Sequence, residues 1–267
     1  MLIAVDLDGT LLNEKKKVGS EEKKWIVNYL NTGNSFAVIT TRNYDDSWPI
    51  VKEFFEDKKA NIFLAYDEGR HIIGKNNYYA QTPVLTTRMV NDIVKVSGKA
   101  TGYTCYSDVN SIDFLKSHIK VVMLKGYHFF KGDRCKVKFM SKLKNIESSF
   151  WKVRINYSEG IEIYEEYLRI KKLLNNYCVT LNEGKIEIMN YKAGKLGALV
   201  AICSRCNTNL NEVIYIGDEG NDIYCMMNTI SYAMGNAPEW VKNIAKQCTL
   251  TNREHGVLKI FNSLKIV

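Results

Sequence analysis

The chain has 267 residues, of which 46% are hydrophobic and 25% are charged. This balance is typical of a folded globular protein and is too apolar for a disordered one. The length allows one large domain, or one domain that carries a smaller inserted one. The formal net charge is +8, but the lysines and arginines are scattered in short groups. A solvated basic surface is therefore favoured over a nucleic-acid site.

The cysteines and apolar segments bear on location. There are seven cysteines, and the apolar start at Met1–Val5 is too short for a signal peptide. No segment reaches the ~20 apolar residues of a membrane span. We therefore expect a protein of the reducing cytoplasm. Cys203 and Cys206 have the C-x-x-C spacing of some redox and zinc sites. They fall in a predicted helix without a second Cys or His pair, so packing is the favoured interpretation.

The first part of the chain alternates strands and helices. Short apolar runs at 2–5, 35–40 and 62–66 predict buried strands, and the first two end in polar residues. Helices are predicted from Ser20, which opens an acidic first turn, and over 44–57. This order predicts a doubly wound parallel sheet with right-handed crossovers.

The middle of the chain lacks this alternation. Helices are predicted near 86–97, 133–145 and 163–175, and strands near 101–106, 119–125, 150–157 and 176–181. Turn signals interrupt them. We interpret residues 83–182 as an inserted α+β domain, and residues 1–82 with 183–267 as the α/β core. Core-type elements are expected again from Lys185, with a strand at 186–189, a helix at 195–206 and a strand at 213–216.

Two carboxylates follow the first strand in the segment Asp6-Leu7-Asp8-Gly9-Thr10. Acids at i and i+2 on a strand-end loop can converge, so that one attacks while the other transfers a proton. Gly9 allows a tight turn that points backbone amides at a phosphate oxygen. A polar strand-end turn is the alternative interpretation of this segment taken alone.

Two further segments add groups that suit a phosphate. Thr40-Thr41-Arg42 lies at the end of the second strand and offers a hydroxyl donor and a positive charge. Lys195 lies at a predicted helix start, against the preference of the helix dipole, so an anionic group should offset its charge. A surface lysine is the alternative. The spacing of a P-loop is absent.

Three more acids occur in Gly217-Asp218-Glu219-Gly220-Asn221-Asp222, after the strand at 213–216. Clustered carboxylate oxygens suit Mg²⁺, while the pattern of an EF-hand calcium loop is missing. Several carboxylates in one place would repel each other without a cation. Mg²⁺, together with Lys195, is therefore the predicted partner of these acids.

Together these segments resemble the haloacid dehalogenase superfamily, in particular its Cof-type sugar-phosphatase-like branch with a type-IIB cap. The resemblance rests on DLDGTLL at 6–12, VITTR at 38–42, the Lys195 segment and IGDEGND at 216–222. The blocks YAMGNAPEWVK at 232–242 and TLTNREHGV at 249–257 indicate the branch. The resemblance covers about residues 1–75 and 183–260, and the predicted insertion falls where this branch carries its cap.

The resemblance implies a role for each matching residue. Asp6 is the implied nucleophile, Asp8 the acid and base, and Thr40 and Lys195 hold the phosphoryl oxygens. The implied Mg²⁺ ligands are Asp6, Asp8 through its backbone carbonyl, Asp218 and Asp222. Further substrate or phosphate contacts are implied for Leu7, Gly9, Thr41, Arg42, Asn221 and Asn236. The expected enzyme is a Mg²⁺-dependent phosphatase that acts on small phosphorylated metabolites through an aspartyl-phosphate, with neither nucleic acid nor membrane as partner.

The sequence departs from the family pattern without losing any of these groups. Thr41 stands where glycine is usual, and Tyr66–Arg70 replaces a common N-G-A loop. Asp8 favours phosphoryl transfer over dehalogenation, because a halide leaves without a proton. A sugar-phosphate mutase and a catalytically silent sugar-phosphate-binding protein stay open as alternatives. A hexose or pentose phosphate is the expected substrate class, and no oligomeric state is predicted.

Overall fold

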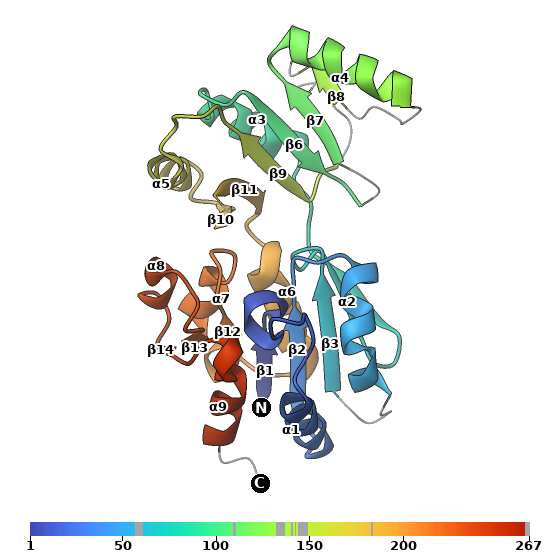
Figure 1. Cartoon of the computed structure of the whole chain (residues 1–267), viewed down its shortest axis with the longest axis vertical. Coiled ribbons are helices and arrows are strands. Elements are labelled where there is room, and N and C mark those ends of the chain that lie inside the picture. Colours follow the sequence, from blue (N-terminus) through green and yellow to red (C-terminus); the bar gives the residue numbers. More distant parts are fainter. Residues whose placement is uncertain are drawn as a thin grey trace. The chain divides into compact units, whose positions relative to one another are not determined.

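The computed structural model describes residues 1–56, 61–108, 111–131, 137–139, 141, 143, 149–182 and 184–264. The chain forms two compact units (Figure 1). Unit 1 comprises Met1–Thr82 and Gly194–Val267, and unit 2 comprises Pro83–Ala193. Among the described residues, no helix has both the length and the apolar character needed to cross a bilayer.

Unit 1 is built on an eight-stranded sheet with the order β14-β13-β12-β1-β2-β3-β4-β5. The first six of these strands run parallel: β14 (Gln247–Cys248), β13 (Ile230–Ala233), β12 (Ile214–Gly217), β1 (Leu2–Val5), β2 (Ser35–Ile39) and β3 (Asn61–Tyr66). An antiparallel hairpin of β4 (His71–Gly74) and β5 (Tyr78–Gln81) completes the sheet. The hairpin was not predicted from the sequence, whereas the three N-terminal strands lie where the apolar runs placed them.

Helices cover both faces of this sheet, which explains the unbroken apolar strands. Ile3 and Val5 of β1 pack in one core with α1 (Ser20–Asn31), α2 (Tyr44–Val51) and α9 (Gly256–Ser263). The alternate residues Leu2 and Ala4 pack in a second core with α6 (Gly194–Cys206), α7 (Ile223–Asn228) and α8 (Glu239–Lys242). Because successive side chains of a strand point to opposite faces, both faces need apolar residues. The predicted helix over 44–57 ends at Val51 and continues as a 3-10 turn, Lys52–Phe55.

Cys203 and Cys206 lie on α6 and pack in the second core. Cys203 is buried and Cys206 is partly buried. Their position agrees with the packing interpretation of the C-x-x-C spacing.

Unit 2 has a six-stranded sheet with the order β10-β11-β9-β6-β7-β8. Its strands are β6 (Gly102–Tyr106), β7 (Ser111–Leu115), β8 (Val137–Phe139), β9 (Lys152–Asn156), β10 (Tyr177–Asn182) and β11 (Lys185–Asn190). All neighbouring pairs are antiparallel except β7 and β8. The helices are α3 (Thr87–Val96), α4 (His118–Lys131) and α5 (Ile163–Leu173).

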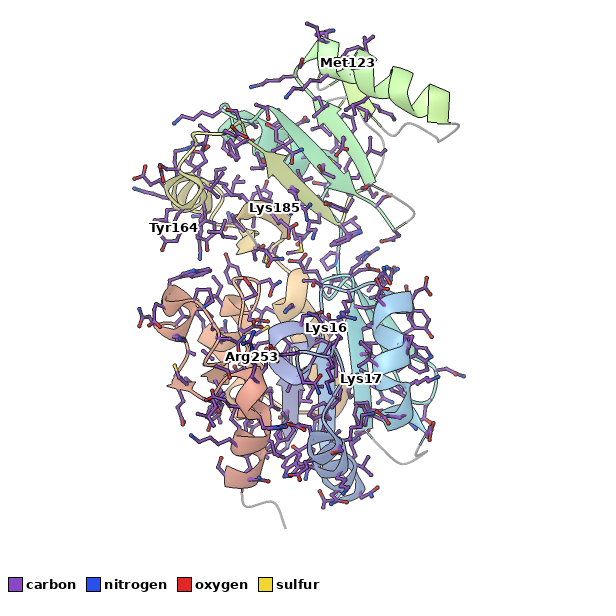
Figure 2. The ribbon with its side chains drawn as sticks, viewed as in Figure 1. Lys16, Lys17, Met123, Tyr164, Lys185 and Arg253 are labelled. Atoms are coloured by element: carbon purple, nitrogen blue, oxygen red, sulfur yellow. The ribbon has the colours of Figure 1, made fainter. Side chains whose placement is uncertain are left out.

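Two predictions within unit 2 are wrong. The predicted strand 119–125 lies inside helix α4. Its β-branched residues suggested a strand, but Val121 is buried while Ile119, Val122 and Met123 are exposed (Met123 is labelled in Figure 2), so residues 119–125 of the helix pack through Val121. The predicted helix 133–145 contains strand β8, which pairs with β7. The rest of that range lies outside the described residues, apart from 141 and 143.

The boundary between the units differs from the prediction at one end. The first crossing lies between Thr82 and Pro83, but the second lies between Ala193 and Gly194 and not at 182/183. Strand β11 is the reason, because it pairs with β10 on one side and β9 on the other. Its apolar residues Ile186 and Ile188 therefore belong to the core of unit 2.

Candidate active site

The candidate site lies at the carboxyl ends of three neighbouring parallel strands of unit 1. Asp6 follows β1, Thr40 follows β2, and Asp218 follows β12. Parallel strands end at one edge of a sheet, which is where sites of doubly wound folds occur. The sheet order therefore brings together acids that are more than 200 positions apart in the sequence.

A wide turn, Leu7–Leu11, carries the first motif past the end of β1. The Asp6 backbone N–H donates to Ile216 O at 2.9 Å, which ties this turn to β12. Gly9 has a φ of +71°, and a Cβ atom there would lie 2.1 Å from Asp218 Oδ2. Only glycine lets the two acidic loops approach so closely.

Three carboxylates and one ammonium form the centre of the site. Ligand oxygens of Asp6, Asp218 and Asp222 lie within 4.8 Å of one another. Lys195 Nζ lies 2.6 Å from Asp6 Oδ1 and 2.7 Å from Asp222 Oδ1. All four side chains are buried. Lys195 is in the first turn of α6, and these two carboxylates offset its unfavourable place in the helix dipole.

Asp222 accepts hydrogen bonds from several groups of this cluster. Its Oδ1 accepts from the Lys195 ammonium and from the Tyr215 hydroxyl at 2.6 Å. Its Oδ2 accepts from the backbone N–H groups of Asp218 and Glu219, both at 3.0 Å. With four donors on two oxygens, Asp222 holds the acidic turn and the lysine in place. Asp6 and Asp218 are thus better suited than Asp222 to bind a metal directly.

The electrostatics of the cluster suit a divalent cation. Burial raises the pKa of Asp6 above its usual range, against the opposing effect of Lys195. Burial also raises the pKa of Asp218, and the charges of Asp6 and Asp222 add to the shift. One ammonium facing three carboxylates leaves negative charge uncompensated. In the same turn, Asn221 Oδ1 is buried and has no hydrogen-bond partner among the described residues. Oxygen donors of this kind match the preference of Mg²⁺.

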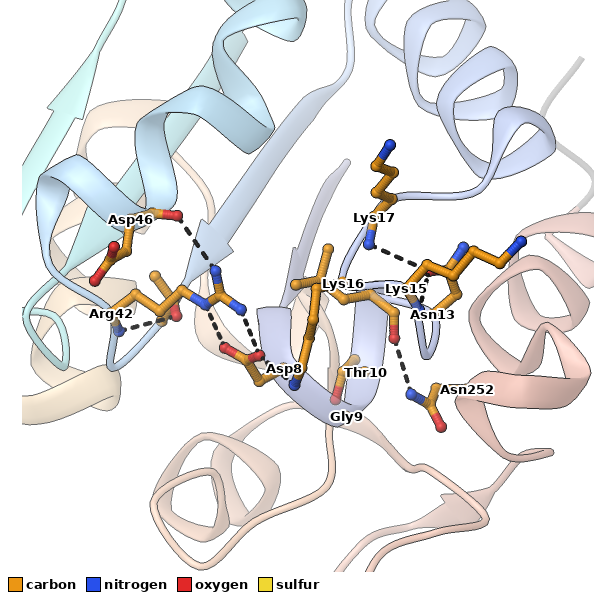
Figure 3. Close-up of polar contacts among 12 residues, drawn as sticks. Asp8, Gly9, Thr10, Asn13, Lys15, Lys16, Lys17, Arg42, Asp46 and Asn252 are labelled. Carbon is orange, nitrogen blue, oxygen red and sulfur yellow. Dashed lines mark hydrogen bonds and ion pairs between the residues drawn. The ribbon is translucent and has the colours of Figure 1, made fainter.

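Two cations contact the Asp8 carboxylate (Figure 3). Arg42 Nε lies 2.6 Å from Asp8 Oδ2, and Arg42 Nη2 lies 2.7 Å from Asp8 Oδ1. Lys16 Nζ reaches Asp8 Oδ1 at 3.0 Å. The hydrogen bonds from Arg42, followed by those from Lys16, hold the pKa of Asp8 below its ordinary value. The Arg42 guanidinium, expected at a phosphate, is thus engaged by a carboxylate in this structure.

The remaining residues of the first two motifs take different positions. Thr40 is buried, and its Oγ1 accepts from the Arg42 backbone N–H at 3.2 Å. Thr41 is exposed. The Leu7 side chain is buried in the hydrophobic core, so only the backbone of Leu7 is available for a phosphate.

Two asparagines connect the C-terminal motifs to the site. The Asn236 amide donates to Gly9 O at 2.9 Å and to Asp218 Oδ2 at 3.1 Å. Asn236 Oδ1 accepts from the Asn252 backbone N–H, and the Asn252 amide donates to Leu12 O at 2.8 Å. This network fixes the loops that follow β1 and β12 relative to one another.

Sequence reasoning assigned no role to four residues that contact the site. Thr10 donates to Asp218 Oδ1 at 2.9 Å, and Asn252 and Tyr215 make the contacts given above. Thr10 and Asn252 are part of recognisable motifs and could have been singled out. Tyr215 sits in an apolar strand, and Lys16 is one of three consecutive lysines, so neither carries a sequence signal.

A family model described as haloacid dehalogenase-like hydrolase matches residues 3–261. The chain belongs to this family. The match spans both units and confirms the superfamily, and its Cof-type branch, predicted from the motifs. This haloacid dehalogenase-like chain is therefore an enzyme of a hydrolase family.

Similar proteins cover nearly the whole chain. A 5-amino-6-(5-phospho-D-ribitylamino)uracil phosphatase of Bacillus subtilis is 26% identical over 264 residues, which are 97% of this chain and 93% of that protein. A protein of Escherichia coli with the same described activity is 25% identical over 281 residues, 98% of this chain and 95% of its own length.

Among solved structures, one described as a HAD subclass IIB sugar phosphatase has a TM-score of 0.72 and 17% identity, and the match covers 100% of this chain and 99% of that one. This likeness confirms the predicted fold class, a doubly wound α/β core with an inserted α+β cap. Units 1 and 2 are called the core and the cap from here on.

Proposed function

We propose that this hydrolase is a Mg²⁺-dependent phosphatase that cleaves small phosphate monoesters through an aspartyl-phosphate on Asp6. The observation that carries the proposal is the contact of Lys195 with Asp6 within a cluster of three buried carboxylates. A buried ammonium beside a carboxylate nucleophile is suited to neutralising the equatorial oxygens of a transferring phosphoryl group.

The reaction has two steps at Asp6. In the first, an Asp6 carboxylate oxygen attacks phosphorus, the ester P–O bond breaks, and the leaving oxygen takes a proton from Asp8. In the second, Asp8 removes a proton from water, the water oxygen attacks phosphorus, and inorganic phosphate leaves Asp6. Asp8 thus acts as acid and then as base, which requires a carboxyl held next to the reacting oxygen.

The phosphoryl group would be held by Lys195, the Thr40 hydroxyl and backbone N–H groups of the Leu7–Leu11 turn. A bound Mg²⁺ would supply positive charge at the phosphoryl oxygens. Asp6, Asp218 and the Asp8 backbone carbonyl would bind it, with Asp222 as the supporting residue. Asn221 and Asn236 would complete the surroundings of the phosphate.

The proposed substrates are sugar or polyol phosphates. Two relatives are named for an ester in which phosphate is attached to a ribityl chain. An alkoxide leaving group of this kind needs a proton, and Asp8 is present to donate it. The cap is the proposed source of selectivity. Its Arg154, Asn156 and Lys185 are among the residues that line a pocket of about 400 Å³.

Release of phosphate from a panel of phosphomonoesters, with Mg²⁺ and with EDTA, tests this function. The panel should contain pentose, hexose and ribityl phosphates, nucleotides and p-nitrophenyl phosphate. We expect release from a subset only in Mg²⁺, and none from Asp6→Asn, which preserves size and fold. Asp45→Asn, an exposed change in α2, is the matched control and should be fully active.

Other outcomes point to the alternatives. Conversion of a sugar monophosphate to its positional isomer without phosphate release would indicate a mutase. Binding of sugar phosphates without turnover by a folded, Mg²⁺-loaded chain would indicate a binding protein. Retained turnover in Asp6→Asn would exclude the covalent mechanism.

A further inference from the structure

A short loop, Leu12–Val18, presents Lys16 to Asp8. Leu12 and Val18 form an antiparallel bridge that closes the loop. Inside it, Asn13 Oδ1 accepts from the backbone N–H groups of Lys15 and Lys17, at 3.0 and 3.2 Å. The Asn13 backbone N–H donates to Lys17 O at 3.0 Å. Figure 3 shows the bonds to Asn13 Oδ1. Together these contacts give the loop a defined shape.

Lys16 occupies an unfavourable backbone conformation in this loop. Its φ is +54°, in the left-handed region that is costly for a residue with a Cβ atom. Its side chain is 65% exposed, and an exposed ion pair contributes little to stability. The free energy that the contact with Asp8 adds to the stability of the fold therefore does not exceed the cost of the left-handed backbone at Lys16. Strained backbone that presents a side chain to a site motivates a functional hypothesis.

Lys16 and Arg42 hold the Asp8 carboxylate from different segments. Arg42 follows β2 and also donates to Asp46 O at 3.3 Å. Its two bonds keep the carboxylate coplanar with the guanidinium. Lys16 adds a third contact, at Oδ1, from the loop that follows the first motif. Among the described residues, Lys16 makes no hydrogen bond or ion pair with Asp6, Asp218 or Asp222, so its effect on the reaction must pass through Asp8.

We propose that Lys16 is a positioning residue that orients the Asp8 carboxyl group, which in its protonated form transfers its proton to the leaving oxygen. The inference rests on the proposed function, in which Asp8 is the acid. Loss of Lys16 should therefore slow only reactions in which the leaving oxygen needs a proton. It should not affect p-nitrophenyl phosphate, because p-nitrophenolate departs without one.

The test compares kcat/KM for an alkyl phosphate and for p-nitrophenyl phosphate in wild type and Lys16→Met. The value of kcat/KM covers the steps up to the first irreversible one, and these include departure of the leaving group. Lys16→Met also removes a charge that attracts anionic substrates, but this effect is common to both esters and cancels in the ratio of their kcat/KM values. We expect kcat/KM for the alkyl ester to fall about 10-fold, as for a displaced catalytic group. For p-nitrophenyl phosphate it should change less than about twofold.

Three controls separate positioning from a structural role. Lys17→Met should behave as wild type, because the Lys17 side chain points away from Asp8 (Figure 3). Lys16→Arg, which keeps a cation at the same site, should restore most of the lost activity. In an Asp8→Asn background, Lys16→Met should cause no further loss, since the two residues act through one step.

The outcomes distinguish this inference from the proposed function. Equal losses for both esters, or no loss for either, would overturn the positioning role while the phosphatase itself stands. A further loss in the Asp8→Asn background would also overturn it. Absence of Mg²⁺-dependent hydrolysis by the wild type would remove the proposed function and the inference that rests on it.

Discussion

Lys195 Nζ contacts Asp6 Oδ1 at 2.6 Å although the two residues are 189 positions apart in the chain. The whole cap lies between them in sequence. The contact arises because α6 begins where the chain returns from the cap to the core, and α6 packs beside β1, the strand that Asp6 follows. One buried ion pair therefore joins the two sequence segments of the core at the point of chemistry.

Removal of the Lys195 ammonium should impair both activity and folding. Lys195→Met leaves three buried carboxylates without their cation, so the free energy of unfolding should fall by about 3–5 kcal/mol in EDTA. Phosphate release should fall at least about 100-fold, as when one charge-stabilising group is lost. Urea denaturation with EDTA and with Mg²⁺ measures the first effect, and Mg²⁺ should restore part of the lost stability. Equal stability of variant and wild type in EDTA would contradict the charge argument.

Gly9→Ala should damage the site more than a positive φ alone explains. The added Cβ would lie 2.1 Å from Asp218 Oδ2, whereas Gly33 has a similar φ of +81° and nothing within 4 Å of a Cβ. Gly33→Ala should therefore cost only about 1–2 kcal/mol of unfolding free energy, the price of the left-handed backbone. Gly9→Ala should cost more in the same urea measurement and should also weaken Mg²⁺ binding. Matching losses in both variants would mean that the loops separate without penalty.

The contact between His255 and Glu22 should make stability depend on pH. His255 Nδ1 lies 2.7 Å from Glu22 Oε1. The hydrogen bond and charge of Glu22 raise the pKa of His255 above its ordinary value. A raised folded-state pKa means that the stabilisation is complete below the unfolded-state pKa and is lost as pH rises through the folded-state pKa.

His255→Gln should therefore lower the free energy of unfolding at pH 5.5 but not at pH 9. The side chain is 60% exposed, so the expected effect is about 0.5 kcal/mol. Urea denaturation of both proteins at the two pH values measures it. The same difference at both values would assign the contribution to packing or to a neutral hydrogen bond.

A buried hydroxyl in the cap should be dispensable. Thr180 is 1% exposed and its Oγ1 has no hydrogen-bond partner among the described residues. Thr180→Val keeps the shape and removes the unsatisfied group, so we expect about 1 kcal/mol of added stability. Thr104→Val is the matched control in the same sheet. Thr104 Oγ1 donates to Asp113 and accepts from Asn156, at 2.6 and 3.1 Å, so that variant should be less stable. Destabilisation by Thr180→Val would reveal a partner for its hydroxyl.

Much of the core and its site could be predicted from the sequence by itself. Apolar runs that end in acids identify buried parallel strands and the sheet edge where Asp6, Thr40 and Asp218 meet, because local hydrophobicity and strand direction are properties of the chain. The ordered motifs then indicated the family. Lys195 was found because a lysine at a helix start needs an anion nearby.

Only the tertiary structure decided the contacts that depend on pairing. Strand β11 has the apolar pattern of a core strand, yet it belongs to the cap because it pairs with β9 and β10. Residues 119–125 have strand-like composition but form a helix that buries Val121 alone of its apolar stripe. In the sequence Lys16 cannot be distinguished from the neighbouring lysines, and only the loop Leu12–Val18 directs its side chain towards Asp8. In each case the outcome depends on contacts that the pattern of the segment itself does not reveal. Bringing the contacting groups together costs chain entropy, and this cost is recovered only when the fold forms.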